Sequence, residues 1–384
     1  MTLLAATAFW HVPELPRQID DRPALRDAER MRTDPWIFYA GVDHRSGRPA
    51  GHLARHAIYL LCGPSQRGFH LFSIALHVAI AFLVACLAFR WNAAAPRLAG
   101  ALFLLNVAHF KAVHHIAALE YLLATGFSVG AYLLLWAKED LLARPSRLAL
   151  LYLCIIGATA SHIASWGMWP VFAWVMWQRG YRWQTALQLA LPLLIINATF
   201  SVHVLAQMQT DDYTTTSRAL GFLASGEVWS LTALRMFAWF VAYLFLFAHA
   251  APWPMWEAPL WQIGIGTTLI VVALWQVYAG RRSPIRDCAL WIACTLVPFA
   301  LQSEETIRHV PGPSRYFYLG TVASSILIAE AVALARHLRG GAIWRGIAFC
   351  LCLVSSIFYL RKVEALSWYT GSIIARSEGD FARA

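Results

Sequence analysis

The chain has 384 residues, of which 59% are hydrophobic and only 14% are charged, and its mean hydropathy is +0.52. This composition excludes an ordinary soluble domain, because most of the chain falls into apolar runs near the roughly 20 residues that cross a bilayer. The formal charge of +10 does not indicate nucleic-acid binding, since Arg and Lys lie mainly in short loops beside these runs, where they orient membrane helices. We therefore expect an all-α polytopic membrane protein with no nucleic-acid partner.

The first twelve residues, MTLLAATAFWHV, are apolar but too short to cross a bilayer. They lack the charged n-region and the A-x-A cleavage site of a signal peptide, so we interpret them as a short or truncated first span. A polar loop follows at about residues 13–67, and it contains IDDRPALRD at positions 19–27, with three Asp and two Arg residues. A loop this long and polar is more than a connector.

The same loop contains GRPAGHLARHAIYLLCG at positions 47–63. On a helix, apolar side chains of this segment share one face and basic side chains fall largely on another: Leu53, Ala57, Leu60 and Leu61 against His52, Arg55 and His56. Such a helix lies along the membrane surface. An acidic turn above it forms a cleft in which a water-side substrate meets a lipid-side one.

Longer apolar runs predict about eleven or twelve crossings in one helical bundle. They are residues 68–90, 98–114, 116–137, 148–165, 166–178, 185–207, 228–250, 260–279, 288–302, 316–335 and 341–360. We expect one transmembrane domain over residues 1–365 and a short C-terminal tail over residues 366–384.

The positive-inside bias orients these spans. Basic residues in three alternate loops, within residues 90–97, 138–147 and 179–182, place those loops in the cytoplasm and the Asp-rich loop outside. The arginines at 281, 282 and 286 should also be cytoplasmic, although a simple count of spans puts them outside. One segment between residues 185 and 279 is therefore miscounted: it is interfacial or re-entrant, or two crossings are read as one. With the charge bias, residues 303–315 join the Asp-rich loop outside.

Several segments, in their order and spacing, resemble one family. They are DD-x-P-x-L-x-D, then GRP, the interfacial helix, GFHLFSIALHVAIAFLVACLAFR and LLNVAHFKAVHHIAALEYLLA. This order resembles the GT-C superfamily of integral-membrane glycosyltransferases, and within it the branch of protein O-mannosyltransferases and transmembrane and tetratricopeptide-repeat O-mannosyltransferases. The likeness covers about residues 10–140 and, less closely, SRYFYLG at 314–320.

The resemblance implies a GT-C-like bundle that transfers a sugar, mannose or another hexose, from a polyprenyl-phosphate donor to an acceptor hydroxyl on the outer face, with inversion. Asp20 and Asp21 match the family's acidic pair, and one of them would be the base that removes the acceptor's proton, a step worth a factor of about 10² to 10⁴. The alternative is structural, because Asp21 precedes Arg22 and Pro23 and is well placed to cap a helix.

The leaving lipid phosphate needs cations, and guanidinium matches phosphate geometry. We expect Arg315 to hold the donor phosphate, with support from Arg308 and Tyr316; the alternative for Arg315 is an interfacial anchor. Lys111 stands where the family's pattern has a Glu, so the position of a second acid is taken by a base. It either binds the donor phosphate or extends to the membrane interface.

Four residues are expected to line the substrate cleft at the outer helix ends: Arg48 of GRP, His109, His114 and His115. The histidines do not have the spacing of a metal site, so no metal or other cofactor is expected. The partners expected are the polyprenyl-linked sugar donor, membrane lipid, and an acceptor that is a protein, a glycan or a lipid.

Two other functions stay open. A catalytically inactive GT-C relative could serve as an assembly or binding partner, which fits the change at Lys111. A transporter of polyprenyl-linked glycans would place ionisable groups near the bilayer midplane and often has internal repeats, but here acids gather in an outside loop and no repeat is found. We expect an integral protein of a bacterial inner membrane with its active site on the periplasmic side.

Overall fold

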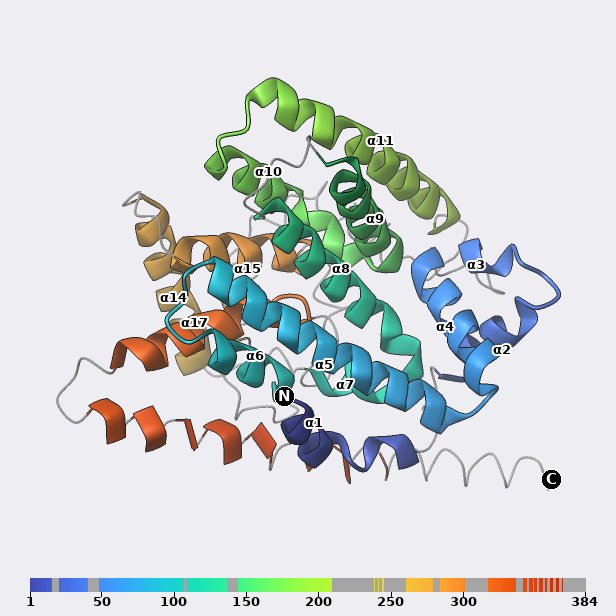
Figure 1. Ribbon diagram of the computed structural model, residues 1–384, viewed down its shortest axis with the longest axis horizontal. Helices are drawn as coiled ribbons and strands as arrows, with labels where there is room; N and C mark the ends of the chain where they lie inside the picture. Colours follow the sequence, from blue (N-terminus) through green and yellow to red (C-terminus); the bar gives the residue numbers. More distant parts are fainter. Residues whose placement is uncertain are drawn as a thin grey trace.

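The computed structural model describes residues 1–15, 21–40, 48–106, 109–136, 144–208, 260–278, 284–300 and 317–335, with isolated helical residues at 238, 241 and 244 and between 341 and 368. All regular structure in these ranges is helical, as Figure 1 shows. The predicted all-α architecture is therefore confirmed for the part of the chain that is described.

The helices follow one another closely along the chain. Their bounds are α1 Thr2–Phe9, η1 Val12–Glu14, α2 Asp21–Arg30, α3 Ile37–Ala40, α4 Pro49–Cys62, α5 Gln66–Arg90, α6 Pro96–Leu104, α7 Phe110–His114, η3 Ile116–Ala118, α8 Leu119–Leu135, α9 Pro145–Ser161, η4 Ile163–Met168, α10 Trp169–Gln178, α11 Trp183–Met208, α14 Leu260–Tyr278, α15 Pro284–Ala300 and α17 Thr321–Leu334. Several begin at proline, whose fixed φ suits the first turn of a helix.

Helix α8 forms the centre of the bundle and packs against α5 and α9. Of its apolar window, 67% is buried, whereas only 39% of the window of α5 is buried. Aromatic side chains of α5 such as Phe82 and Phe89 point away from the protein and are 62% and 69% exposed. A helix with such an uncovered apolar face is more stable in a lipid environment than in water.

Two described helices are long and apolar enough to cross a membrane, α5 and the stretch Ile116–Leu135. Shorter apolar helices are Pro145–Ser161, Ile263–Val272, Thr321–Leu334 and Gly341–Val354. The number of crossings predicted from the sequence stays a prediction, and most of the span expected at residues 228–250 lies outside the described residues.

The span expected over residues 98–114 is wrong as a single helix. Helix α6 ends at Leu104, and the chain resumes helical structure only at α7. The helix ends in a turn at Leu105 and Asn106. Beyond this turn, the imidazole of His109 lies in the core and is hydrogen-bonded to Thr321. A polar side chain near the end of a helix competes for backbone hydrogen bonds and favours such a break.

Helix α17 runs antiparallel to α6. Thr321 at its start is hydrogen-bonded to His109, just beyond the end of α6, and Glu330 near its other end accepts a hydrogen bond of 2.7 Å from the backbone N–H of Ala94, just before α6 begins. The start of α15 is tied to the end of α10, since Asp287 accepts from Trp174 and Gln178. Arg286 therefore lies at the same end of the bundle as Arg179, and the side of the membrane predicted for this end stays a prediction.

Helices α2, α3 and α4 form a separate group at one end of the bundle, drawn in blue on the right of Figure 1. Helix α4 is the helix predicted to lie along the membrane. Its basic face packs inward, with His52 and Arg55 only 2% and 4% exposed, while Leu60 and Leu61 are 62% and 82% exposed. The apolar face is thus left uncovered at the side of the bundle, which is the arrangement of an interfacial helix.

Candidate functional site

Three segments distant in sequence meet in a polar cluster between the blue helices and the bundle, which we name the α2–α4–α8 junction. At its centre is Glu120, in the first turn of α8 and only 3% exposed. Oε1 of Glu120 accepts a hydrogen bond from Nη1 of Arg48, and Oε2 accepts one of 2.7 Å from Nη1 of Arg55. A carboxylate this deeply buried is tolerated because two guanidinium groups compensate its charge.

Arg48 and Arg55 differ in exposure. The side chain of Arg55 is 5% exposed, and its guanidinium also contacts the Ala117 carbonyl and the His52 ring. The side chain of Arg48, at the N-cap of α4, is 33% exposed. Arg55 is thus enclosed in the junction, while the side chain of Arg48 is partly exposed.

A glycine allows α4 to approach α8 this closely. A Cβ at Gly51 would lie 3.2 Å from Cβ of Glu120 and 3.7 Å from Nη1 of Arg55. The distance to Glu120 is tighter than ordinary van der Waals contact, so a larger residue would require the two helices to shift apart.

Asp21, the first residue of α2, is fully buried against η3. Its Oδ1 accepts a hydrogen bond of 3.0 Å from the backbone N–H of Ala117. This N–H belongs to the short turn that leads into Glu120, so Asp21 holds the start of α8 in place. The carboxylate is therefore used structurally in this structure, at the edge of the junction.

The histidines of α4 complete the junction. His52 lies 3.7 Å from Asp27 of α2, and burial lowers the pKa of His52 to about 3, with the Arg55 charge adding to the effect. The ring is thus neutral at physiological pH. His56 donates from Nδ1 to the carbonyl oxygen of Ala28 at 2.7 Å, which fixes α4 against α2. These contacts make the junction a pre-organised site whose charges are the two arginines and the carboxylates around them.

The residues predicted for the site fall into three groups. Arg48 and Asp21 lie in the junction. Asp20, Arg308, Arg315 and Tyr316 lie outside the described residues, as does the side chain of Lys111, whose backbone is part of α7. His109 and His114 are 0% and 1% exposed, and His115 is half-buried between α7 and η3. That these three histidines line a substrate cleft stays a prediction.

The buried histidines form a second cluster, the histidine core, with His77 at its centre. Nε2 of His77 donates to the Leu104 carbonyl at 3.0 Å, and Nδ1 is 2.6 Å from the Tyr318 hydroxyl. A neutral ring satisfies both contacts, because Nδ1 can accept the Tyr318 proton. His109 packs edge-on against His77, with ring centroids 5.0 Å apart. Within the described residues, no group of His, Cys, Asp and Glu is arranged to hold a metal ion.

The sequence analysis missed Glu120 and Arg55 as members of the site. The signal was present, because Glu120 is a lone carboxylate at the start of an apolar run, and an ionisable group in such a run is usually paired and functional. Its partners could not be read from the sequence, since Arg48 and Arg55 lie 72 and 65 residues away.

An apolar cavity of about 560 Å³ lies elsewhere, between α14, α15 and α17. Its walls are aliphatic apart from Glu330, whose carboxylate is already bound to the Ala94 N–H. It offers no group for acid–base chemistry, so the junction remains the better candidate site.

Comparison with solved structures identifies the architecture. The chain superposes on the crystal structure of ArnT from Cupriavidus metallidurans bound to undecaprenyl phosphate with a TM-score of 0.50 and 12% sequence identity, over 96% of this chain and 75% of that chain. The apo state of the same protein gives 0.46 and 14% over 96% and 76%. The chain has the fold of ArnT. This likeness agrees with the helical bundle predicted from the sequence, and the GT-C superfamily stays a prediction.

The likeness to ArnT extends to the fold alone. At 12% identity it does not single out the O-mannosyltransferase branch predicted from the sequence. No protein-family model matches the chain, and no curated protein matches it.

Proposed function

We propose that this protein is a membrane glycosyltransferase that takes its sugar from a polyprenyl-phosphate donor. The observation that carries the proposal is the α2–α4–α8 junction in a GT-C fold: cations and carboxylates gather where an interfacial helix meets the bundle. A fold by itself does not imply a function, so the site has to bear the argument. The ArnT structure is bound to undecaprenyl phosphate, which supports a donor of that lipid class.

Arg48 is the phosphate ligand that the contacts favour. Its guanidinium is hydrogen-bonded to Glu120, and its side chain is 33% exposed. A guanidinium oriented by a buried carboxylate loses little entropy when it binds a phosphate oxygen, and it stabilises the charge that develops on the leaving phosphate. Arg315, Arg308, Tyr316 and Lys111 remain proposed as further ligands of the donor phosphate.

The base in this proposal is Asp20 rather than Asp21. Asp21 accepts from the Ala117 N–H and is fully buried, so its carboxylate already has a structural role. The neighbouring Asp20 would take the proton of the acceptor hydroxyl while the sugar leaves the lipid phosphate with inversion. The acceptor hydroxyl belongs to a protein, a glycan or a lipid. Because His109 and His114 are 0% and 1% exposed, the half-buried His115 is the one of the three predicted histidines that stays proposed for the acceptor side.

The finer assignments rest on the sequence. The Asp-rich segment and the Arg-Pro of α4 favour the O-mannosyltransferase branch, and thus mannose or another hexose. The distribution of basic residues favours a polytopic protein of about eleven or twelve crossings in a bacterial inner membrane, with the junction on the periplasmic side.

The test is sugar release from undecaprenyl-phosphate-linked mannose, and from other hexose donors, by the purified full chain. We expect Asp20→Asn to lower turnover by about 10² or more with the fold retained. Asp21→Asn should instead lower the melting temperature, since it weakens the contact with η3. Glu29→Gln, at an exposed carboxylate of α2, is the matched control and should leave both quantities unchanged. Parental turnover in both Asn variants would contradict a catalytic acidic pair.

A catalytically inactive GT-C relative is the second candidate. It is favoured by one observation, namely that Asp21 and Glu120 are both engaged in contacts that hold α2, α4 and α8 together. If no polyprenyl-linked sugar is released and the Asn variants still complement a deletion strain, this second function holds and the enzyme proposal is wrong.

A further inference from the structure

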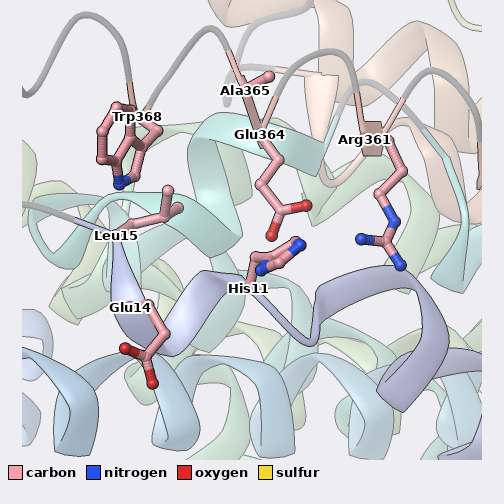
Figure 2. A pocket seen from close by; sticks show the side chains of 7 residues that line it. All are labelled: His11, Glu14, Leu15, Arg361, Glu364, Ala365 and Trp368. Carbon is pink, nitrogen blue, oxygen red and sulfur yellow. The ribbon is translucent and has the colours of Figure 1, made fainter.

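A cavity of about 410 Å³ lies between η1 and the C-terminal segment, apart from the junction. Figure 2 shows its seven lining residues: His11, Glu14, Leu15, Arg361, Glu364, Ala365 and Trp368. The volume is within the range of small-ligand sites. The cavity thus lies between residues from near the start and near the end of the described chain. Four ionisable side chains and one indole are part of its lining.

Glu364 is the unusual group in this cavity. It is only 5% exposed, and its Oε1 has no hydrogen-bond partner among the residues that the structure describes. Burial raises the pKa of Glu364 to about 7, although Arg361 and the His11 backbone oppose the rise. A buried carboxylate without a full set of partners is costly, so the free energy would fall if a ligand supplied a cationic hydrogen-bond donor.

A guanidinium stands next to this carboxylate. Arg361 stacks over the Trp10 ring at 4.9 Å and donates to the Thr7 carbonyl at 3.3 Å, so α1 orients it. Figure 2 shows that Arg361 and Glu364 both project from the C-terminal segment toward the turn that holds His11. A carboxylate and a guanidinium side by side match a ligand with an ammonium and a phosphate.

The cavity lies near the start of α5, on the side where α5 adjoins α4. Leu15 at its edge contacts His70, in the second turn of α5, and the start of α5 adjoins α4, the interfacial helix. Leu15, Ala365 and the 56%-exposed Trp368 form an apolar wall, and an exposed Trp is typical of a membrane interface.

We propose that this cavity binds the headgroup of a phospholipid with a primary ammonium, of the phosphatidylethanolamine class. The ammonium donates to the Glu364 carboxyl, the phosphate accepts from Arg361, and the glycerol and acyl chains lie along Ala365 and Trp368. A quaternary ammonium has the same charge but no N–H, so phosphatidylcholine cannot make the first contact. The site is separate from the junction and does not depend on sugar transfer.

The experiment uses the full chain in dodecyl maltoside and native mass spectrometry with dioctanoyl-phosphatidylethanolamine and dioctanoyl-phosphatidylcholine. We expect the ethanolamine lipid to bind about ten-fold more tightly, the size of one charge-assisted hydrogen bond. Glu364→Gln should abolish this preference, while Glu29→Gln, at an exposed carboxylate of α2, should keep it. O-phosphoethanolamine without acyl chains should bind more weakly than the lipid.

A second readout separates binding from a structural effect of the substitution. Since the ammonium needs the ionised carboxylate, the preference for the ethanolamine lipid should be larger at pH 8 than at pH 6 in the parent and independent of pH in Glu364→Gln. The other ionisable groups of the cavity, His11, Glu14 and Arg361, are present in both proteins. Equal binding of the two lipids, or a preference that survives Glu364→Gln, overturns the proposal. Equal binding of soluble phosphoethanolamine overturns the assignment to a lipid.

Discussion

The α2–α4–α8 junction and the histidine core bury polar side chains by opposite means. In the junction, Glu120 is charged and is compensated by Arg48 and Arg55. In the core, a neutral His77 satisfies a carbonyl and a hydroxyl at once. Of these two regions, the one that retains charge is the junction, in which one partner, Arg48, is partly exposed. Burying charges costs solvation free energy, so we regard the junction as the better candidate for phosphate binding. The neutral histidine core is the better candidate for a purely structural role.

The largest effect is expected when the junction loses its central charge. Glu120→Gln leaves the buried guanidinium of Arg55 without a counter-ion, so stability should fall by about 3 to 5 kcal/mol. Thermal unfolding in detergent measures this, with Glu29→Gln as a matched change at an exposed position. A loss no larger than in the control would mean that the junction does not depend on paired charge.

The two arginines sharpen the comparison within the junction. Arg55→Met should cost about 2 to 3 kcal/mol of stability, because Arg55 is buried, whereas Arg48→Met should cost about 1 kcal/mol or less, since a third of its side chain is exposed. Turnover should follow the opposite order if Arg48 contacts the donor phosphate. Both quantities can be compared in one set of purified variants, and the same order in both would refute the phosphate role.

The histidine core should respond in stability alone. His77→Phe leaves the Tyr318 hydroxyl and the Leu104 carbonyl without their partner, so stability should fall by about 1 to 3 kcal/mol. Turnover per folded molecule should stay at the parental value. A loss of turnover larger than the loss of folded protein would assign the core a part in the chemistry.

A modest effect is expected from the titration of His52. Its pKa is lowered to about 3 in the folded protein, so the unfolded chain binds one more proton between about pH 3 and 6.5. Stability from this group is therefore complete above pH 6.5 and falls with decreasing pH, by about 1 to 2 kcal/mol at pH 5. Melting curves of the parent and His52→Gln at pH 5 and 7.5 test this, and identical pH dependence would contradict it.

The sequence by itself determined the elements and their character. Apolar periodicity and length predicted α5, α8 and α9 within a few residues, and the separated apolar and basic faces predicted α4 as an interfacial helix. These features are local, since they depend on residues within one or two turns of each other. The order of the Asp pair, the Arg-Pro and the apolar runs also indicated a GT-C-like helical bundle, and the chain shares its fold with ArnT at a TM-score of 0.50.

Only the tertiary structure decided which polar groups meet. The break between α6 and α7 depends on His109 entering the core beside Thr321, 212 residues away, so the sequence predicted one helix there. Asp21, Arg48 and Arg55 reach η3 and Glu120 only after α2 and α4 pack on the bundle. Pairing over such separations costs chain entropy, which burial and charge compensation offset in the assembled fold. A local sequence pattern contains neither the entropy cost nor the gain from burial.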